Sequence, residues 1–226
     1  MNKVAVITGV AGGYDKPVEQ NPISGVDFIF FTDGVSVPKA GSIWQVEDLN
    51  TPPGLDPRRM AKFPKINPQR YPLLREYDYT LWIDGTLHIK DPSYVDTMIS
   101  HVKNGLVFSP HFENRDAYSE ATITGHPKYW NEPLSQQAEF YREEGFPEGT
   151  QLYECTTLGM DPNHPEALRL SENWLEHNLF WSYQDQVSLP FCVWRFGIEP
   201  GLLPQSWRKY DWMQMGIHQK DEANNG

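Results

Sequence analysis

The strongest constraint on the fold is a set of three short apolar runs, each closed by a glycine. The runs are KVAVITG at 3–9, VDFIFFTDG at 26–34 and YTLWIDG at 79–85. Runs that are apolar at consecutive positions are typical of strands buried on both faces, as in parallel sheets covered by helices. We therefore expect these three runs to be buried strands.

Helical patterns alternate with these strands along the chain. In DPSYVDTMISHVKNG, at 91–105, a proline stands at the first helical position, apolar residues recur at helical spacing, and a glycine closes the segment. This alternation predicts an α/β fold with a mostly parallel central sheet flanked by helices. Further helices are expected near 58–62, at 133–145 and at 164–182, and further strands at 106–111, 151–161 and 186–197.

The bulk properties limit the classes of function. The chain has 226 residues, which fits one domain over 1–218 followed by a polar tail over 219–226. A formal net charge of −11 argues against a broad electrostatic surface for duplex nucleic acid. No apolar run is long enough for a signal-peptide core or a membrane span, so we expect a soluble, cytoplasmic protein.

Asp84 lies inside an otherwise apolar segment, and its position needs an explanation. A buried carboxylate without a partner costs several kcal/mol or more. In parallel α/β sheets, ligands bind beyond the carboxyl ends of the strands. If the strand ends at Asp84, it carries this carboxylate to the edge of a cleft, and Gly85 leaves room for a ligand near the backbone. The alternative is a structural Asp-Gly turn.

Basic residues are concentrated just before the Asp84 strand, at Arg58, Arg59, Lys62, Lys65, Arg70 and Arg75. Charge alone does not distinguish a solvated face from a phosphate site. A divalent ion such as Mg²⁺ or Mn²⁺ prefers carboxylate and phosphate oxygens together, so Asp84 beside a diphosphate is a plausible metal position. The glycine-rich segment after the first strand contains neither a dinucleotide nor a P-loop fingerprint.

Several motifs in order resemble one known family. The span RRMAKFPKINPQRYPLLREYDYTLWIDGTLHIKDP contains a basic segment and a WIDG strand, and SPHFENRDAYSEA follows at 109–121. With YQDQVSLPFCVW at 183–194, these motifs resemble the plant-type glycosyltransferase-like domain of mucilage- and cell-wall-related proteins. The resemblance runs from about Arg58 to about Trp194.

The resemblance implies the GT-A fold, a nucleotide-sugar-binding α/β domain. In that fold, a D-x-D element at a strand end holds a divalent metal on the donor diphosphate. Here the element is Asp84-Gly85-Thr86, so the second aspartate is missing. Many GT-A enzymes take another ligand from a histidine near the C-terminus, and His218 is the candidate here. We therefore expect Mn²⁺ or Mg²⁺ bound by Asp84 and His218, with a surface histidine as the alternative for His218.

The segment SYQDQVS is similar to the Asp-Gln pair of glycogenin-like retaining glycosyltransferases. The similarity implies that Asp185 and Gln186 lie beside the anomeric carbon and favours retention of configuration. From position alone, the two residues are expected in a loop between a long helix and an apolar strand, where polar side chains face ligands. The alternative is that Asp185 caps the following element.

The remaining predicted contacts divide between donor and acceptor. The donor nucleoside is expected near the first loop and the end of the second strand, and the acceptor near the 109–121 motif. If 112–121 is helical, Arg115 and Tyr118 share a face that Glu120 does not. The donor residues are Thr8, Asp15, Asp33, Arg58, Arg59, Lys62, Lys65, Asp84 and Gly85, and the acceptor or sugar residues are His111, Arg115, Tyr118 and Glu120.

The sequence thus predicts sugar transfer from a nucleotide-sugar to a glycan or another hydroxyl acceptor. Three alternatives stay open. The missing second aspartate suits a non-catalytic nucleotide- or sugar-binding module. A nucleotidyltransferase shares the architecture, but its N-terminal loop is usually richer in basic residues. A compact chain also suits a phage enzyme that glycosylates hydroxymethylated DNA bases, although the acidic balance counts against a DNA acceptor.

Overall fold

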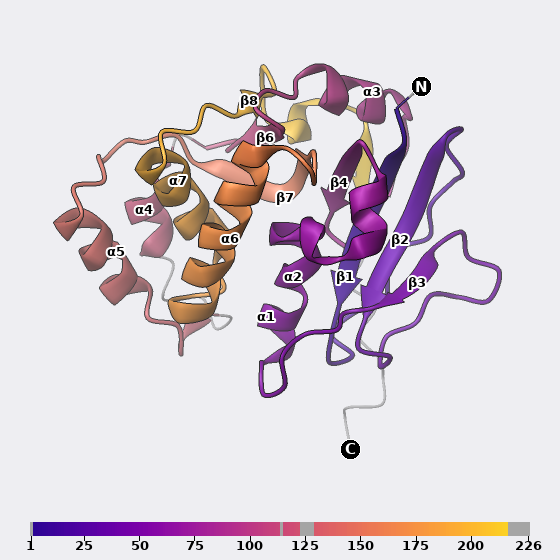
Figure 1. Ribbon diagram of the computed structural model, residues 1–226, viewed down its shortest axis with the longest axis horizontal. Helices are drawn as coiled ribbons and strands as arrows, with labels where there is room; N and C mark the ends of the chain where they lie inside the picture. Colours follow the sequence, from indigo (N-terminus) through magenta and orange to yellow (C-terminus); the bar gives the residue numbers. More distant parts are fainter. Residues whose placement is uncertain (1, 114, 123–128, 217–226) are drawn as a thin grey trace.

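The computed structural model describes residues 2–113, 115–122 and 129–216 (Figure 1). Its centre is a seven-stranded sheet in the order β3-β2-β1-β4-β7-β6-β8. β1 is parallel to β2 and β4, and β2 is parallel to β3. The bounds of these four strands are β1 Val4–Val10, β2 Val26–Thr32, β3 Gln45–Asp48 and β4 Tyr79–Ile83.

The second half of the sheet contains its single reversed strand. β7 is antiparallel to both of its neighbours, β4 and β6, whereas β8 is parallel to β6. The other six strands therefore run in one direction, and the expected α/β fold with a mostly parallel central sheet is confirmed. This architecture is compatible with a GT-A-like fold. The bounds are β6 Leu106–Pro110, β7 Tyr153–Met160 and β8 Gly201–Leu202.

The apolar runs are explained by burial on both faces of the sheet. Along β1, Ala5 and Ile7 belong to one core cluster, whereas Val4 and Val6 belong to the other. Because successive side chains of a strand point to opposite faces, a strand between two cores is apolar at every position.

One face of the sheet is covered by most of the helices, among which α1 and α2 lie in front of the sheet with α6 beside them (Figure 1). The other face is covered by α3 and the segment around η5. The bounds are α1 Pro57–Met60, α2 Lys62–Ile66, η1 Pro68–Arg70, η2 Pro72–Glu76, α3 Ser93–Ser100, α4 Ala117–Ala121, α5 Leu134–Glu143, α6 Pro165–Phe180, α7 Asp185–Arg195 and η5 Trp207–Lys209.

Two expected elements differ from the structure. The segment 186–197 was expected to be a strand, but it forms most of α7. Every residue from Val187 to Val193 is buried, so the helix has no polar face and therefore no helical period in its sequence. The helix expected over 91–105 ends at Ser100, because Asn104 and Gly105 form a tight turn with positive φ of 52° and 73° that leads into β6.

A small second sheet follows the Asp84 turn. β5 (Leu87–Ile89) pairs antiparallel with β9 (Met213–Met215). The carbonyl of Gly85 accepts a hydrogen bond from the N–H of Val18 at 2.8 Å, which ties this turn to the segment after β1. The turn is thus fixed by segments from both ends of the chain.

Gly159, near the end of β7, lies between Leu81 of β4 and Val107 of β6 and provides a test of the packing there. A methyl group on Gly159 would lie 2.7 Å from Val107 Cγ1 and 2.8 Å from Leu81 Cδ2, well inside contact distance. We expect Gly159→Ala to lower the free energy of unfolding by about 1–3 kcal/mol, measured by urea denaturation. Gly85→Ala is the control, because its nearest contact would be an ordinary 3.4 Å, and equal losses in the two variants would contradict this packing.

Candidate functional site

The strand β4 carries Asp84 to the edge of the sheet. β4 ends at Ile83, and the Asp84 side chain, the next along the chain, is 44% exposed. Its backbone N–H donates to the carbonyl of Thr156 at 3.0 Å, and its Oδ1 accepts a hydrogen bond from Trp82 Nε1 at 2.8 Å. The carboxylate is therefore oriented by neighbours while it faces solvent, as expected for a strand-end ligand-binding position.

Gly85 and Thr8 lie close together beside Asp84. A methyl group on Gly85 would lie 3.6 Å from Thr8 Oγ1, so the backbone after Asp84 passes near β1. The Thr8 hydroxyl is buried and has no hydrogen-bond partner among the described residues. A buried hydroxyl without a hydrogen-bond partner is energetically costly, so a polar ligand or a water molecule that hydrogen-bonds to Thr8 would be favoured here.

Four charged residues form the lysine–aspartate cluster next to this turn: Lys62, Lys65, Asp84 and Asp185. Lys62 Nζ and Lys65 Nζ both donate to Asp185 Oδ2, at 2.6 and 2.5 Å. Lys65 Nζ also lies 3.7 Å from Asp84 Oδ1. The side chains of Lys65 and Asp185 are only 3% and 6% exposed, so their charges are compensated inside the protein rather than by water.

The cluster holds its members in their charged forms. Burial alone would raise the pKa of Asp185, but the ammonium groups of Lys62 and Lys65 outweigh it and lower this pKa well below its usual range. Burial alone would lower the pKa of Lys65, but Asp185 and Asp84 raise it above its usual value. Both groups are therefore ionised at neutral pH.

Asp185 differs from its expected local structure. It was expected in a loop or as a cap, but it is the first residue of α7, and Gln184 occupies the cap position. A carboxylate in the first turn of a helix is stabilised by the helix dipole. Gln186 follows in the same turn and is half-buried.

The two arginines of α1 have different surroundings. The Arg58 guanidinium lies over the rings of Tyr14 and Tyr183, and its Nη1 donates to the Tyr183 hydroxyl at 2.6 Å. Arg59 instead pairs with Asp56 and Glu132, each at 2.8 Å. Of the four basic residues predicted to contact the donor, Lys65 reaches Asp84 and Lys62 joins it through Asp185, whereas Arg59 links α1 to the segment before α5.

Glu120 connects the acceptor motif to α7. This buried carboxylate accepts a hydrogen bond from Gln184 Nε2 at 2.6 Å and lies 3.7 Å from Arg115 Nη1. Burial raises its pKa above the usual value. Sequence reasoning missed Gln184, although its place beside Asp185 in the YQDQ motif was a usable signal.

The helix considered over 112–121 is shorter in the structure, so the condition for a shared face of Arg115 and Tyr118 is not met. Helix α4 begins only at Ala117, so Arg115 precedes it and reaches Glu120 instead of sharing a face with Tyr118. The Tyr118 hydroxyl donates to the carbonyl of Phe146 at 2.7 Å and is therefore engaged within the protein. His111 is half-buried, and its ring contacts the backbone of Glu113.

The two aspartates of the N-terminal loops stabilise those loops. Asp33 Oδ2 accepts from the N–H of Gly12 at 2.7 Å, joining the loops after β2 and β1. Asp15 is buried, and its Oδ1 accepts from the N–H of Lys16 at 2.8 Å. Both loops follow the carboxyl ends of parallel strands, as Asp84 does, so they lie along the same edge of the sheet.

The described residues do not by themselves form a metal site. Within 2–113, 115–122 and 129–216, no three His, Cys, Asp or Glu side chains are arranged to hold a metal ion. The Asp84 oxygen that accepts from Trp82 also has the Lys65 ammonium 3.7 Å away, which disfavours a second cation there. His218, the other predicted ligand, lies outside the described residues, so the metal prediction stays untested.

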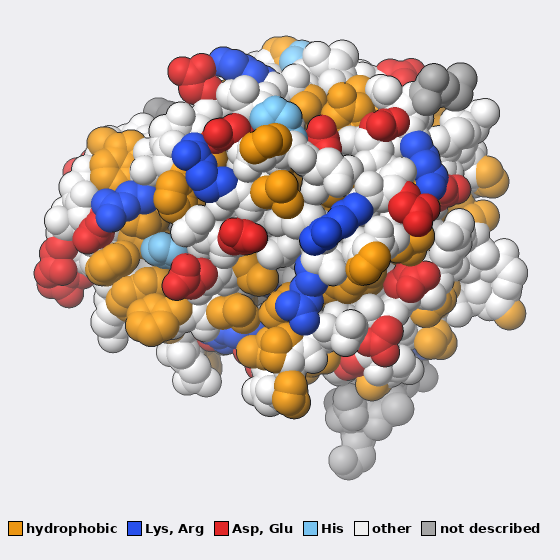
Figure 2. Space-filling view, viewed as in Figure 1, with side chains coloured by type: hydrophobic (Ala, Val, Ile, Leu, Met, Phe, Trp, Pro, Cys, Tyr) orange, Lys and Arg blue, Asp and Glu red, His pale blue; other side chains and the backbone are white. Residues whose placement is uncertain are grey.

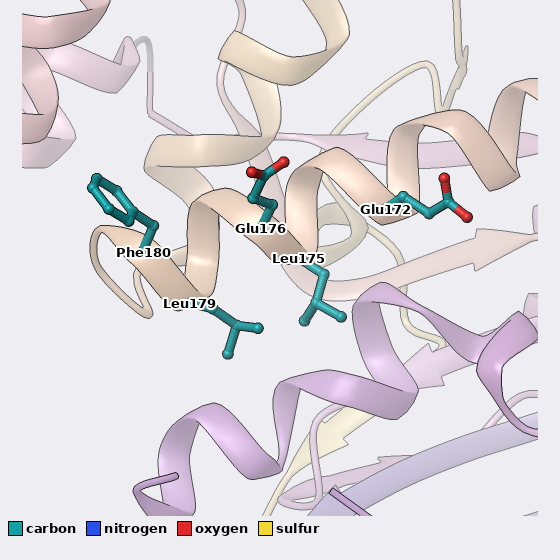
Figure 3. Close-up of a pocket in the computed structure, with 5 residues that line it drawn as sticks. All are labelled: Glu172, Leu175, Glu176, Leu179 and Phe180. Carbon is teal, nitrogen blue, oxygen red and sulfur yellow. The ribbon is translucent and has the colours of Figure 1, made fainter. Parts of the chain in front are cut away.

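The surface offers two further observations. An open hollow of about 480 Å³ lies on α6, where Leu175 and Leu179 point toward α1 and α2 while Phe180 points away (Figure 3). It has carboxylates but no basic group, so it does not suit a phosphorylated ligand.

On the face in Figure 2, basic and acidic side chains are interspersed, so this face has no continuous basic surface for duplex DNA.

A family model described as "TOD1/MUCI70, glycosyltransferase-like domain" matches residues 30–184. No curated protein matches the chain. The matched range includes both lysines of the cluster and Asp84, and ends one residue before Asp185. Within the described part of the chain, no helix has the length and apolar character needed to cross a bilayer.

The cluster predicts a large effect of a small substitution. Asp185→Asn leaves Lys62 and Lys65 without their shared buried counter-charge, so we expect the free energy of unfolding to fall by about 3–5 kcal/mol in urea at neutral pH. The matched control is Glu199→Gln, which breaks an exposed pair with Lys103 and should leave the urea midpoint close to that of the wild type.

The pH dependence follows from the lowered pKa of Asp185. A depressed pKa stabilises the folded state above the unfolded value of about 3.9, and this stabilisation is lost as pH falls through the folded value. The stability difference between the wild type and Asp185→Asn should therefore be constant near neutrality and shrink below about pH 4. A difference that grows on acidification would contradict this assignment.

Proposed function

The chain belongs to the TOD1/MUCI70 family of glycosyltransferase-like domains, and we propose that it transfers a sugar from a nucleotide-sugar to a hydroxyl acceptor. The observation that carries this proposal is the lysine–aspartate cluster at the carboxyl edge of the sheet. It combines an exposed carboxylate, Asp84, with two ammonium groups whose positions are fixed by buried Asp185. Ligands of open α/β sheets bind at this edge.

In this proposal, the donor lies along the edge from the N-terminal loops to α7. The nucleoside contacts the loops of Asp15 and Asp33, and the diphosphate lies near Lys62 and Lys65. The close approach of the Gly85 backbone to Thr8 supports a ligand at this turn, because the Thr8 hydroxyl lacks a partner among the described residues. Arg58, between two tyrosine rings, supplies further positive charge beside the nucleotide.

The reaction breaks the bond between the anomeric carbon and the diphosphate oxygen. The electron pair of that bond stays on the diphosphate, while an acceptor oxygen bonds to the carbon and gives its proton to the departing diphosphate oxygen. Charge therefore builds on the leaving group, and fixed cations stabilise it. Asp185 and Gln186 lie beside the transferred sugar in this proposal, and their resemblance to an Asp-Gln pair favours retention.

The acceptor belongs on the other side of the cluster, near α4. Glu120 reaches Gln184, the residue before Asp185, and Arg115 reaches Glu120. This chain of contacts supports an acceptor hydroxyl near His111 and Arg115.

A second candidate function is a non-catalytic binding module. The observation that favours it is Thr86, which stands where the D-x-D element has its second aspartate. Such a module would bind a nucleotide or a sugar without releasing nucleoside diphosphate from any donor, so the same assay separates the two functions.

The test is the release of free nucleoside diphosphate from a panel of UDP-, GDP-, ADP- and dTDP-sugars. We expect release from at least one donor and its loss in Asp84→Asn, because in this proposal the exposed Asp84 carboxylate accepts hydrogen bonds from hydroxyl groups of the donor. The variant should keep the fold, because an asparagine oxygen can still accept from Trp82 Nε1 and Lys65 keeps Asp185 as its partner.

Asp211→Asn is the matched control, since Asp211 is 92% exposed and pairs with Lys90 on the surface. It should release nucleoside diphosphate at the wild-type rate. Near wild-type release by Asp84→Asn would remove Asp84 from the mechanism. Binding of a nucleotide without release from any donor would favour the binding module.

A further inference from the structure

We propose that Lys62 and Lys65 supply the positive charge at the donor diphosphate, so that donor binding and leaving-group departure need no divalent metal. The inference rests on the proposed function and deepens it, because it assigns the cation of that site to two side chains. It replaces the expected Mn²⁺ or Mg²⁺ with a cation that the chain itself carries.

The first observation is the position of Lys65. Its ammonium lies 3.7 Å from the Asp84 carboxylate, the position at which the D-x-D resemblance places a metal. Lys65 is held there by a 2.5 Å hydrogen bond to buried Asp185 and is only 3% exposed. A divalent ion on the same Asp84 oxygen would have to tolerate this fixed positive charge in a partly desolvated site.

The second observation is the poverty of metal ligands among the described residues. The residue two positions after Asp84 is Thr86, and Asp84 Oδ1 already accepts from Trp82. No group of three His, Cys, Asp or Glu side chains in the described part of the chain is arranged for a metal. Among the described residues, the surroundings of Asp84 therefore provide few of the oxygen ligands that Mg²⁺ or Mn²⁺ needs, but they provide the ammonium groups of Lys62 and Lys65.

The third observation is that the two lysines suit a diphosphate. An ammonium has three donors, and Asp185 Oδ2 takes one from each lysine. Two ammonium groups share a single buried carboxylate, so the inner part of the cluster carries a positive charge that Asp84 balances only from 3.7 Å away. Lys62 is 18% exposed, so it can be reached from solvent, and the more buried Lys65 completes a preorganised pair.

This arrangement supports the reaction without another reagent. As the bond between the anomeric carbon and the diphosphate oxygen breaks, the electron pair and its negative charge move to that oxygen. Lys62 and Lys65 hydrogen-bond to the diphosphate while the acceptor oxygen bonds to the carbon and gives its proton to the departing diphosphate oxygen. Asp185 acts here as a positioning residue, because it fixes both ammonium groups before the donor binds.

The test measures binding by calorimetry, with UDP, GDP, ADP and dTDP as probes, once with EDTA and once with Mn²⁺. We expect at least one nucleotide to bind with nearly the same dissociation constant in both buffers. Lys62→Gln should weaken that binding about 10- to 100-fold, the usual value of a hydrogen bond to a charged group. Lys62→Arg should restore most of it, because the charge returns.

Lys62 is chosen because it is the more exposed of the pair, and thermal unfolding of each variant checks that the fold is kept. Lys103→Gln is the matched control, since Lys103 pairs with Glu199 on the surface and should leave binding unchanged. Binding only in Mn²⁺ would overturn this inference but keep the proposed function. Wild-type affinity in Lys62→Gln would also overturn it. No binding in either buffer would overturn both proposals.

Discussion

The buried contact of Asp185 with Lys62 and Lys65 is the interaction on which the rest of this site depends. Two ammonium groups donate to one carboxylate oxygen at 2.6 and 2.5 Å, and the residues lie more than a hundred positions apart in the chain. The contact joins α2 to the first turn of α7, and Lys65 extends it to the end of β4. Moving a charged group out of water costs free energy unless an opposite charge pairs with it. The buried Asp185 carboxylate and the two lysine ammonium groups therefore stabilise one another.

The sheet explains why these elements meet. Asp84 follows a parallel strand, so it lies at the same edge as the loops after β1 and β2. β7 runs in the opposite direction and extends past the end of β4. Its residue Thr156 therefore lies at this edge, where its carbonyl accepts a hydrogen bond from the backbone N–H of Asp84. The small sheet of β5 and β9 then fixes the turn from outside. The Asp84 carboxylate is thus oriented by backbone contacts of its segment and one indole N–H, with the Lys65 ammonium beside it.

Local sequence patterns predicted the parts of the fold that depend on local burial. The run at 3–9 is apolar at every position because β1 lies between two cores. The same rule failed for α7, in which every residue from Val187 to Val193 is also buried, so a largely apolar run there belonged to a helix. Periodicity distinguishes strand from helix only where one face is polar.

The sequence indicated which residues to consider for the candidate site, but it did not indicate how those residues contact one another. The basic segment and Asp84 were identified, yet charge alone left a solvated face as an equal alternative for the lysines. Lys65 is 3% exposed because it pairs with Asp185, and no local pattern indicates a contact across 120 residues. Similarly, Arg115 reaches Glu120 because α4 starts two residues after it, a helix boundary that spacing did not indicate.

The most direct test of the central claim is a crystal structure of the protein with the nucleoside diphosphate that binds it. We expect diphosphate oxygens within hydrogen-bonding distance of Lys62 or Lys65, beside Asp84 and the Gly85 backbone. A diphosphate bound instead between the loops after β1 and β2, at the hollow of about 210 Å³ that Lys16 and Lys39 line, would contradict the account. The lysine–aspartate cluster would then be a purely structural link between α2 and α7.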